Sequence, residues 1–484
     1  MRQSEIRQGD GLRVALARVS AGADRYAPAD IRQALNNLGN ALGWAKDGKG
    51  PFGAAIASGA RVVVKPNWVM HRNKGPWGVE CLVTHPTVVK QVVEAALQSG
   101  ADRVTVGDAP IQGCNWEALM AFGDLGRWAG ELATAQPRFA GAVDFRRTRS
   151  RQLDGVLVQA EDQVPLSSYV LFDLGRESLL EPVSGEAQAF RVTQYDPDKM
   201  RHTHQPGRHQ YLVAREIIAA DVVVSVPKLK THRKAGITNA LKNLVGINGN
   251  KEFLPHHRVG GSQEGGDCYP GRSVVKRSHE LILDAQNRSR AHLWRRILNV
   301  PARMLSLAGT MFVDQIGIDG SWSGNDTVWR MCLDLNRILL YGRLDGSLAD
   351  EPQRRVLTVA DAIVAGQGDG PLAPEPFGLG VLFGGDNAAA MDHVGARLLG
   401  MDPQRIPIAR EAFGRFRWPL AQESAAAVDP RWVDGAPVSF AEIPEPESYP
   451  LGWLDAVAGD RRGEAPTGRS YRPPLRERLT PQEA

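Results

Sequence analysis

The chain has 484 residues, and its 58 Lys and Arg residues nearly balance its 54 Asp and Glu residues, which leaves a formal net charge of +4. Hydrophobic residues make up 43% of the chain, enough for a sizeable core without disulfides. The small charge, without a Lys/Arg block or interleaved aromatic residues, argues against nucleic acid as a partner. We find neither a membrane span nor the apolar core of a signal peptide, so we expect a cytoplasmic protein.

The four cysteines are widely spaced, at Cys81, Cys114, Cys268 and Cys332. This spacing matches no zinc-ribbon, redox or cluster-binding pattern. We therefore expect reduced thiols and no iron–sulfur cluster.

The first predicted elements form a strand, helix, strand unit. RVVV at 61–64 predicts a strand that stops at Pro66, because proline cannot donate to a strand ladder. Pro86 fits the first position of a helix that ends near Gly100, and RVTV at 103–106 predicts the next strand. This second strand leads to Asp108, so a carboxylate stands at a strand exit.

Later segments continue the alternation of strands and helices. DVVVSVP at 221–227 predicts a strand, and the next helix is expected to start near Thr238 and to end before Gly246. Further strands are predicted at 356–364 and 378–384, the last followed by a helix. The pattern predicts an α/β fold, with a mostly parallel doubly wound sheet and helices on both faces.

We divide the chain into three parts. Residues 1–60 are a lead-in with a strand and a helix, and residues 61–417 form the α/β core. Two long insertions interrupt that core at about 114–200 and 262–350. Residues 418–484 form a Pro-rich tail that is either extended along the core or partly disordered.

The densest polar stretch of the sequence runs from Pro227 to Ser273 and is rich in lysine, histidine and glycine. Because ligands of open α/β sheets bind outside the carboxyl ends of strands, we expect part of one small-molecule site here. Lysine side chains and the amides at the expected helix start near Thr238 would suit a phosphate or carboxylate, and Gly246, Gly249, Gly260 and Gly261 would let backbone approach a ligand. The predicted substrate-binding residues are Lys65, Asn67, Lys228, Lys230, Lys242 and Asn243. The alternative is a solvated basic face.

Seven of the eleven histidines lie between His202 and His279, a crowding that suggests proton transfer or metal ligation. We predict His232, His256 and Asp108 as catalytic groups. For a divalent metal ion, the hypothesis is a site made of His256, His257, Asp267 and Cys268. For any single histidine, a structural role is the alternative. The carboxylates of Asp361, Asp369, Asp386 and Asp392 fit either caps and turns or a hard cation.

Several common motifs are absent. The sequence has no phosphate-binding G-x-x-x-x-G-K-[ST] loop, no G-x-G-x-x-G after a strand, no G-x-S-x-G and no H-E-x-x-H. This argues against the usual nucleotide-hydrolysing, dinucleotide-binding, serine-hydrolase and zinc-protease classes.

Several segments together resemble an uncharacterised family, the domain of unknown function 362. They include VVVKPNW, PKLKTH, ALKNLVG and VADAIVAGQGDGP, and the resemblance spans most of residues 61–402. Many relatives carry ferredoxin-like cysteine runs, which this chain lacks. The His- and Gly-rich region is also loosely similar to the N-terminal domain of nickel-dependent lactate racemases, but Gly265–Gly271 lacks their lysine. The resemblance implies an architecture and assigns no reaction or cofactor.

Three functions stay open. The leading hypothesis is an enzyme that acts on a small anionic metabolite, by metal-assisted proton transfer or an isomerase-like reaction. The second is a non-enzymatic ligand-binding or accessory protein of a biosynthetic pathway, such as a polysaccharide pathway. The third is an iron–sulfur or redox accessory protein.

Overall fold

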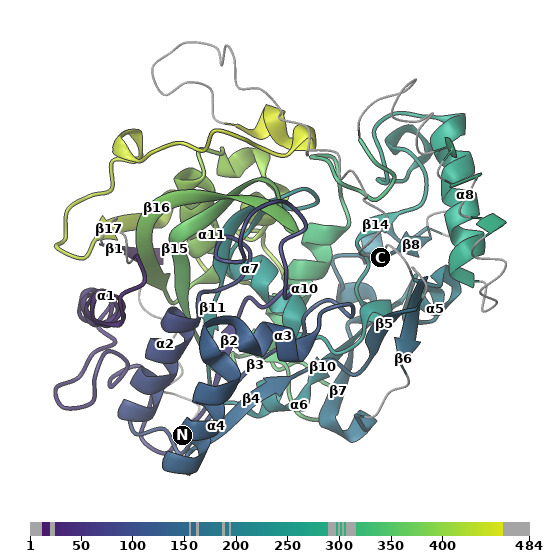
Figure 1. Ribbon diagram of the computed structural model, residues 1–484. Helices are drawn as coiled ribbons and strands as arrows, with labels where there is room; N and C mark the ends of the chain where they lie inside the picture. Colours follow the sequence, from purple (N-terminus) through teal and green to yellow (C-terminus); the bar gives the residue numbers. More distant parts are fainter. Residues whose placement is uncertain are drawn as a thin grey trace.

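The computed structural model describes residues 12–19, 25–153, 156–160, 164–185, 189–192, 195–288, 297–298, 301–302, 304–305 and 316–457. A large mixed sheet forms its centre (Figure 1). Its main strands are β1 (Leu12–Arg18), β2 (Arg61–Pro66), β3 (Arg103–Asp108), β4 (Phe139–Asp144), β11 (Val222–Val226), β15 (Arg355–Asp369), β16 (Ala373–Gly385) and β17 (Val428–Trp432). β12 (Lys228–His232) and β13 (Gly236–Thr238) extend it beside β15.

The strands lie in the order β17-β1-β16-β15-β11-β2-β3-β4. Five neighbours, from β4 through β3, β2 and β11 to β15, are parallel, and β17 is parallel to β1. β16 runs antiparallel to its two neighbours, β15 and β1, and β13 runs antiparallel to β12. The predicted mostly parallel sheet is confirmed. From β2 the chain winds outward through β3 and β4 and later returns to the other side of β2 with β11, so the direction of winding switches between β2 and β11.

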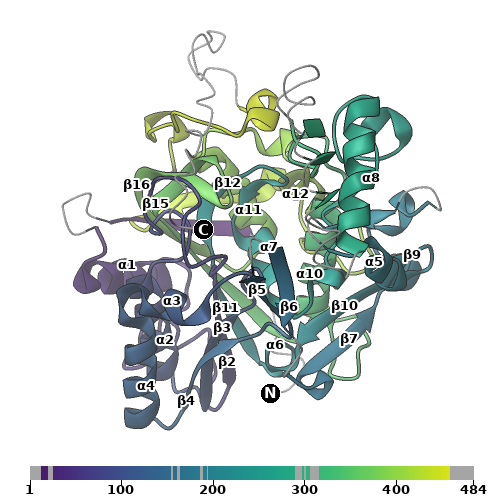
Figure 2. The same ribbon diagram turned by 45° about the vertical axis from the view of Figure 1, so that its right-hand side comes forward.

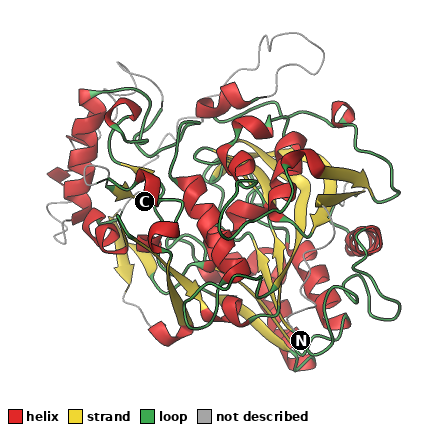
Figure 3. Cartoon of the chain, turned by 180° about the vertical axis from the view of Figure 1, so that it is seen from behind, coloured by secondary structure: helices red, strands yellow, loops and turns green. Residues whose placement is uncertain are grey.

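Helices cover both faces because the central strands bury side chains alternately on each side. Val62 and Val64 belong to one core, together with α1 (Pro28–Ala41), α2 (Pro86–Gln98), α3 (Trp116–Ala121) and α4 (Leu125–Ala135). Val63 belongs to the other, with α6 (Arg215–Ala219), α7 (Ala240–Asn243), α10 (Val328–Tyr341), α11 (Ala388–Leu398) and α12 (Pro407–Glu411). Figure 3 shows this arrangement from behind.

The helix predicted to start near Thr238 and to end before Gly246 is shorter than expected. Thr238 pairs with Lys230 in the antiparallel ladder of β12 and β13, so this residue is held in a strand. The α-helix begins at Ala240 and ends at Asn243, and a 3₁₀ turn follows over Leu244–Ile247. The helix predicted from Pro86 is confirmed as α2, where the His85 side chain caps the Thr87 amide.

A second group of elements packs beside the main sheet. It contains a sheet of β7 (Tyr169–Asp173), β10 (Arg208–Ala214) and β9 (His204–Gln205), the pair of β8 (Phe190–Arg191) with β14 (His257–Arg258), and the pair of β5 (Arg149–Leu153) with β6 (Val156–Ala160). It also contains α5 (Pro197–Thr203) and α8 (Val274–Arg288), and α8 lies across the molecule from α1, α2 and α4 (Figures 1 and 2). The start of the predicted 114–200 insertion, through β4, is part of the main sheet.

Much of the predicted C-terminal tail packs on the core. β17 pairs with β1, and the fully buried Trp453 donates a hydrogen bond from Nε1 to the carbonyl oxygen of Arg233 (2.6 Å). Residues 458–484 lie outside the described residues. Within the described part of the chain, no helix combines the length and apolar character needed to cross a bilayer.

Candidate functional site

The polar residues predicted for the site gather where the winding of the sheet switches. Lys65 lies one residue before the end of β2, Asp108 ends β3, and Lys230 lies in β12, just beyond the end of β11. Because these strands are parallel, their carboxyl ends meet at one edge of the sheet.

Lys65 and Asp108 form a buried ion pair, with Nζ 2.7 Å from Oδ1. The carboxylate also accepts hydrogen bonds from the backbone amides of Trp68 (2.6 Å) and Ala109 (2.8 Å). Burial raises the pKa of Asp108 and lowers the pKa of Lys65, and each charge opposes the shift of the other. Since its oxygens are engaged, Asp108 holds Lys65 in place in this arrangement.

Gly246 lies directly against this ion pair. A Cβ atom at this position would come within 1.8 Å of Asp108 Oδ1 and 2.7 Å of Lys65 Nζ. The glycines predicted to approach a ligand thus contact protein: Gly249 lies against the ring of Tyr169, and Gly261 against the carbonyl oxygen of Gly271.

Two asparagines connect the ion pair to Lys230. Asn243 Oδ1 accepts hydrogen bonds from Lys65 Nζ (3.1 Å) and Asn67 Nδ2 (3.3 Å). Lys230 Nζ donates to Asn67 Oδ1 (3.0 Å) and to the carbonyl oxygen of Leu82. Lys230 therefore has uncharged acceptors, and burial lowers its pKa to about 7.

Lys228 is held apart from Lys230 by its own set of partners. Its Nζ pairs with Asp361 Oδ2 at 2.6 Å and donates to Tyr26 Oη (3.1 Å) and the carbonyl oxygen of Val364 (3.1 Å). Tyr26 in turn stacks on the ring of His85, with 3.6 Å between the centroids. Lys228 and Asp361 are completely buried, so this predicted substrate-binding lysine joins β12 to β15.

The two predicted catalytic histidines have opposite tautomers, fixed by backbone hydrogen bonds. His232 Nδ1 accepts from the amides of Lys234 (3.0 Å) and Ala235 (3.1 Å), so its proton is on Nε2. His256 Nδ1 lies 2.7 Å from the carbonyl oxygen of Leu254, which can only accept, so His256 carries its proton on Nδ1. Burial and the charge of Lys242 hold the pKa of both rings well below the usual range, which keeps them neutral near pH 7.

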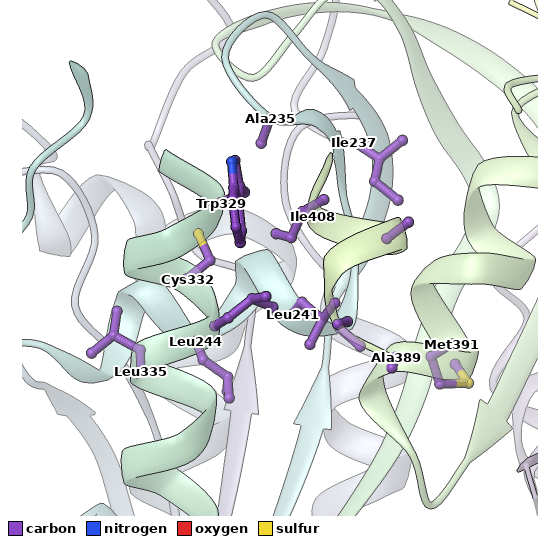
Figure 4. Close-up of a cluster of buried hydrophobic side chains, with 14 of the residues drawn as sticks. Ala235, Ile237, Leu241, Leu244, Trp329, Cys332, Leu335, Ala389, Met391 and Ile408 are labelled. Atoms are coloured by element: carbon purple, nitrogen blue, oxygen red, sulfur yellow. The ribbon is translucent and has the colours of Figure 1, made fainter. Parts of the chain in front are cut away.

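Lys242 is fixed by the hydrophobic residues beside it. Leu241 and Leu244 pack into a cluster with Cys332 and Leu335 of α10 (Figure 4). Asp392 of α11 accepts a hydrogen bond from the Leu241 amide (3.2 Å), and burial raises the pKa of this carboxyl to about 8. These contacts hold the short α7 helix against the protein interior.

Lys242 belongs to a group of six cationic or titratable side chains that we call the basic cluster: Lys230, His232, Lys234, Lys242, Lys251 and His256. Repulsion from positive charges of the cluster helps to lower the pKa values of Lys230, His232, Lys242, Lys251 and His256, so these groups lie within electrostatic range of one another. Burial lowers the pKa of Lys251 to about 8. Lys234 pairs with Asp319 at 3.2 Å, whereas the Nζ atoms of Lys242 and Lys251 have no hydrogen-bond or ion-pair partner among the described residues.

Two members of the basic cluster were missed from the sequence. Both lie within the stretch from Pro227 to Ser273, Lys234 in the turn between β12 and β13 and Lys251 at the start of a 3₁₀ turn over Lys251–Phe253. Periodicity gives no direction for side chains in such irregular segments, so their position in the sequence was the only available signal.

Of the four predicted metal ligands, His256 and Asp267 have hydrogen-bond partners within the protein, whereas the buried Nδ1 of His257 has none among the described residues. Asp267 accepts from the Arg258 amide (2.5 Å), the Asp326 amide (2.9 Å) and Thr327 Oγ1 (2.6 Å). Burial raises the pKa of Cys268 and lowers that of His257 to about 3. Across the described residues, no three His, Cys, Asp or Glu side chains are arranged to hold a metal ion. Metal binding by His256, His257, Asp267 and Cys268 stays a prediction.

The fold and the cluster define a doubly wound α/β protein with a polar site at the switch in its sheet. The family described as Domain of unknown function (DUF362) matches residues 62–151 and 168–397, and the chain belongs to this family. No curated protein matches the chain. A crystal structure of a Thermotoga maritima protein from the Northeast Structural Genomics Consortium is similar at 12% identity and a TM-score of 0.31, over 72% of this chain and 54% of that one. This chain thus spans about half the length of that protein.

Proposed function

We propose that this protein is an enzyme that binds a small anionic molecule at the basic cluster and transfers a proton on it. The observation that carries the proposal is the pair of ammonium groups of Lys242 and Lys251, which have no partner among the described residues and adjoin two neutral histidines. Burying a cation without a counterion is unfavourable, and an anion at this position would supply the missing partner.

The histidine tautomers assign different roles to the two rings. His256 Nε2 is unprotonated and can act as a general base. His232 Nε2 carries a proton and can donate a hydrogen bond to an oxygen on which negative charge develops. The proton would move from the substrate to His256, and the charge left behind would be stabilised by His232 and the neighbouring lysines.

The other predicted site residues support this arrangement without contacting the substrate. Asp108 and Asn243 hold Lys65, and Asn67 holds Lys230. We also propose a cytoplasmic location without nucleic acid as a partner, which the nearly balanced charge and the widely spaced cysteines support.

The proposal is tested by incubating the purified protein with a filtered metabolite extract and comparing small anions by mass spectrometry before and after. The wild type should convert at least one anion, and His256→Gln should abolish this conversion while leaving the fold intact. Lys46→Met, which removes an exposed lysine outside the cluster, should behave as the wild type.

An unchanged extract with folded wild-type protein would count against catalysis. If the protein also released an unaltered anion on denaturation, and Lys242→Met did not, the alternative of a non-enzymatic binding protein would replace the proposal.

A further inference from the structure

The lysines around the site differ in whether a carboxylate neutralises them. Lys65 pairs with Asp108, Lys228 with Asp361, and Lys234 with Asp319. Lys242 and Lys251 have no such partner among the described residues. Two positive charges are therefore left over beside the proposed substrate position.

No nearby group in the described chain cancels these two charges. The negative charge that raises the pKa of Lys251 is that of Asp108, and this carboxylate already pairs with Lys65. The group that would raise the pKa of Lys242, if it were ionised, is the thiol of Cys332. Burial raises the pKa of this thiol to about 12, so it is uncharged at pH 7 and cannot balance the lysine. His232 and His256 are neutral as well.

The two ammonium groups are also within reach of a small ligand. Lys242 is 9% exposed, and Lys251 and His256 are half-buried. The Nζ atoms of both lysines are not completely buried. The Nε2 atoms of His232 and His256 are not completely buried either. Each of these nitrogens therefore exposes some surface that a ligand oxygen could contact.

We propose that the natural ligand is a small dianion whose two negative charges pair with Lys242 and Lys251, with His232 Nε2–H as a further donor to one of its oxygens. This inference rests on the proposed function and specifies the charge of its substrate. A monoanion would leave one ammonium group without a counterion. A dicarboxylate and a phosphate monoester share the required chemistry, since both present several oxygens that accept charge-assisted hydrogen bonds.

Calorimetric titration of the full-length protein with malonate, methyl phosphate and acetate at pH 7 tests the proposal, because malonate and the phosphate monoester are mainly dianions at this pH. At least one dianion should bind at least about tenfold more tightly than acetate, which corresponds to one additional charge-assisted hydrogen bond. A preference for malonate would indicate a dicarboxylate, and a preference for methyl phosphate would indicate a phosphorylated molecule.

Lys242→Met and Lys251→Met should each abolish this preference, so that the dianion and acetate bind with about equal affinity, whereas Lys46→Met should retain it. Replacing an unpaired buried charge by an apolar side chain of similar size does not remove a folding contact, so both variants should fold. Lys242→Arg and Lys251→Arg keep the charge and should retain most of the preference.

Acetate binding as tightly as both dianions would overturn the proposal, as would the absence of binding by all three anions to the folded protein. If either result were obtained and the protein still converted an anion from the metabolite extract, the inference of a dianionic ligand would be wrong. The proposed enzymatic function would still stand. Equal loss of acetate and malonate affinity in Lys242→Met would also overturn the pairing of two charges with two lysines.

Discussion

Replacing Gly246 by alanine should break the buried ion pair of Lys65 and Asp108. The new Cβ would lie 1.8 Å from Asp108 Oδ1, well inside van der Waals contact. The carboxylate cannot turn aside, because the amides of Trp68 and Ala109 hold it at 2.6 and 2.8 Å. Gly246 cannot retreat freely either, since its carbonyl oxygen accepts a hydrogen bond from that same Ala109 amide (2.8 Å).

The expected loss of stability depends on whether the ion pair separates or the surrounding atoms are compressed. Separating a buried ion pair costs about 3–5 kcal/mol, and overpacking alone costs about 1–3 kcal/mol, so we expect a loss of about 3 kcal/mol in the free energy of unfolding. Urea denaturation followed by tryptophan fluorescence measures it. The control is Gly130→Ala in α4, where a Cβ meets nothing within 4 Å and should stabilise the helix by about 0.5–1 kcal/mol. Equal midpoints for Gly246→Ala and the wild type would refute the close approach of Gly246 to the pair.

Three further predictions address neighbouring groups. Lys228→Met should lower the free energy of unfolding by about 3–5 kcal/mol, because it leaves Asp361 buried without its counterion, and unchanged urea stability would contradict the structural role of Lys228. In ¹⁵N NMR spectra, His232 should carry its proton on Nε2 and His256 on Nδ1, and both should stay neutral well below pH 6.5; titration of either ring near pH 6.5 would argue against this site. Burial raises the pKa of Asp392 to about 8, so the folded state keeps a proton that the unfolded state loses, and stability falls as pH rises toward 8. Asp392→Asn should therefore match the wild type at pH 4 and exceed it by about 5 kcal/mol at pH 8, because the pKa rises by about four units at about 1.4 kcal/mol each, and equal stability at both pH values would show that Asp392 ionises normally.

The sequence was informative where local signals determine structure. Pro66 ends β2 and Pro86 begins α2, as the restrictions on proline predict. The rule that parallel strands meet at their carboxyl ends anticipated that Lys65 and Asp108 lie close together, and they form an ion pair.

Partners from remote segments were beyond the reach of sequence patterns. Lys228 and Lys230 follow the same strand on alternate positions, which suggested one shared anion site. The side chains that contact Lys228 are Tyr26 and Asp361, which are 335 residues apart in the chain, and only the folded structure reveals that Asp361 neutralises the lysine. Histidine tautomers were equally hidden, because they depend on which backbone group faces each ring nitrogen.

The position of β1 has a consequence for synthesis of the chain. This strand ends at Arg18, whereas its two neighbours, β16 and β17, begin at Ala373 and Val428, so it is synthesised long before either of them. Until β16 has been synthesised, the two edges of β1 have no native strand to pair with, and an unpaired apolar strand is prone to join foreign ones. Completion of the central sheet is thus a late event, and the nascent protein is most vulnerable to aggregation before β16 emerges.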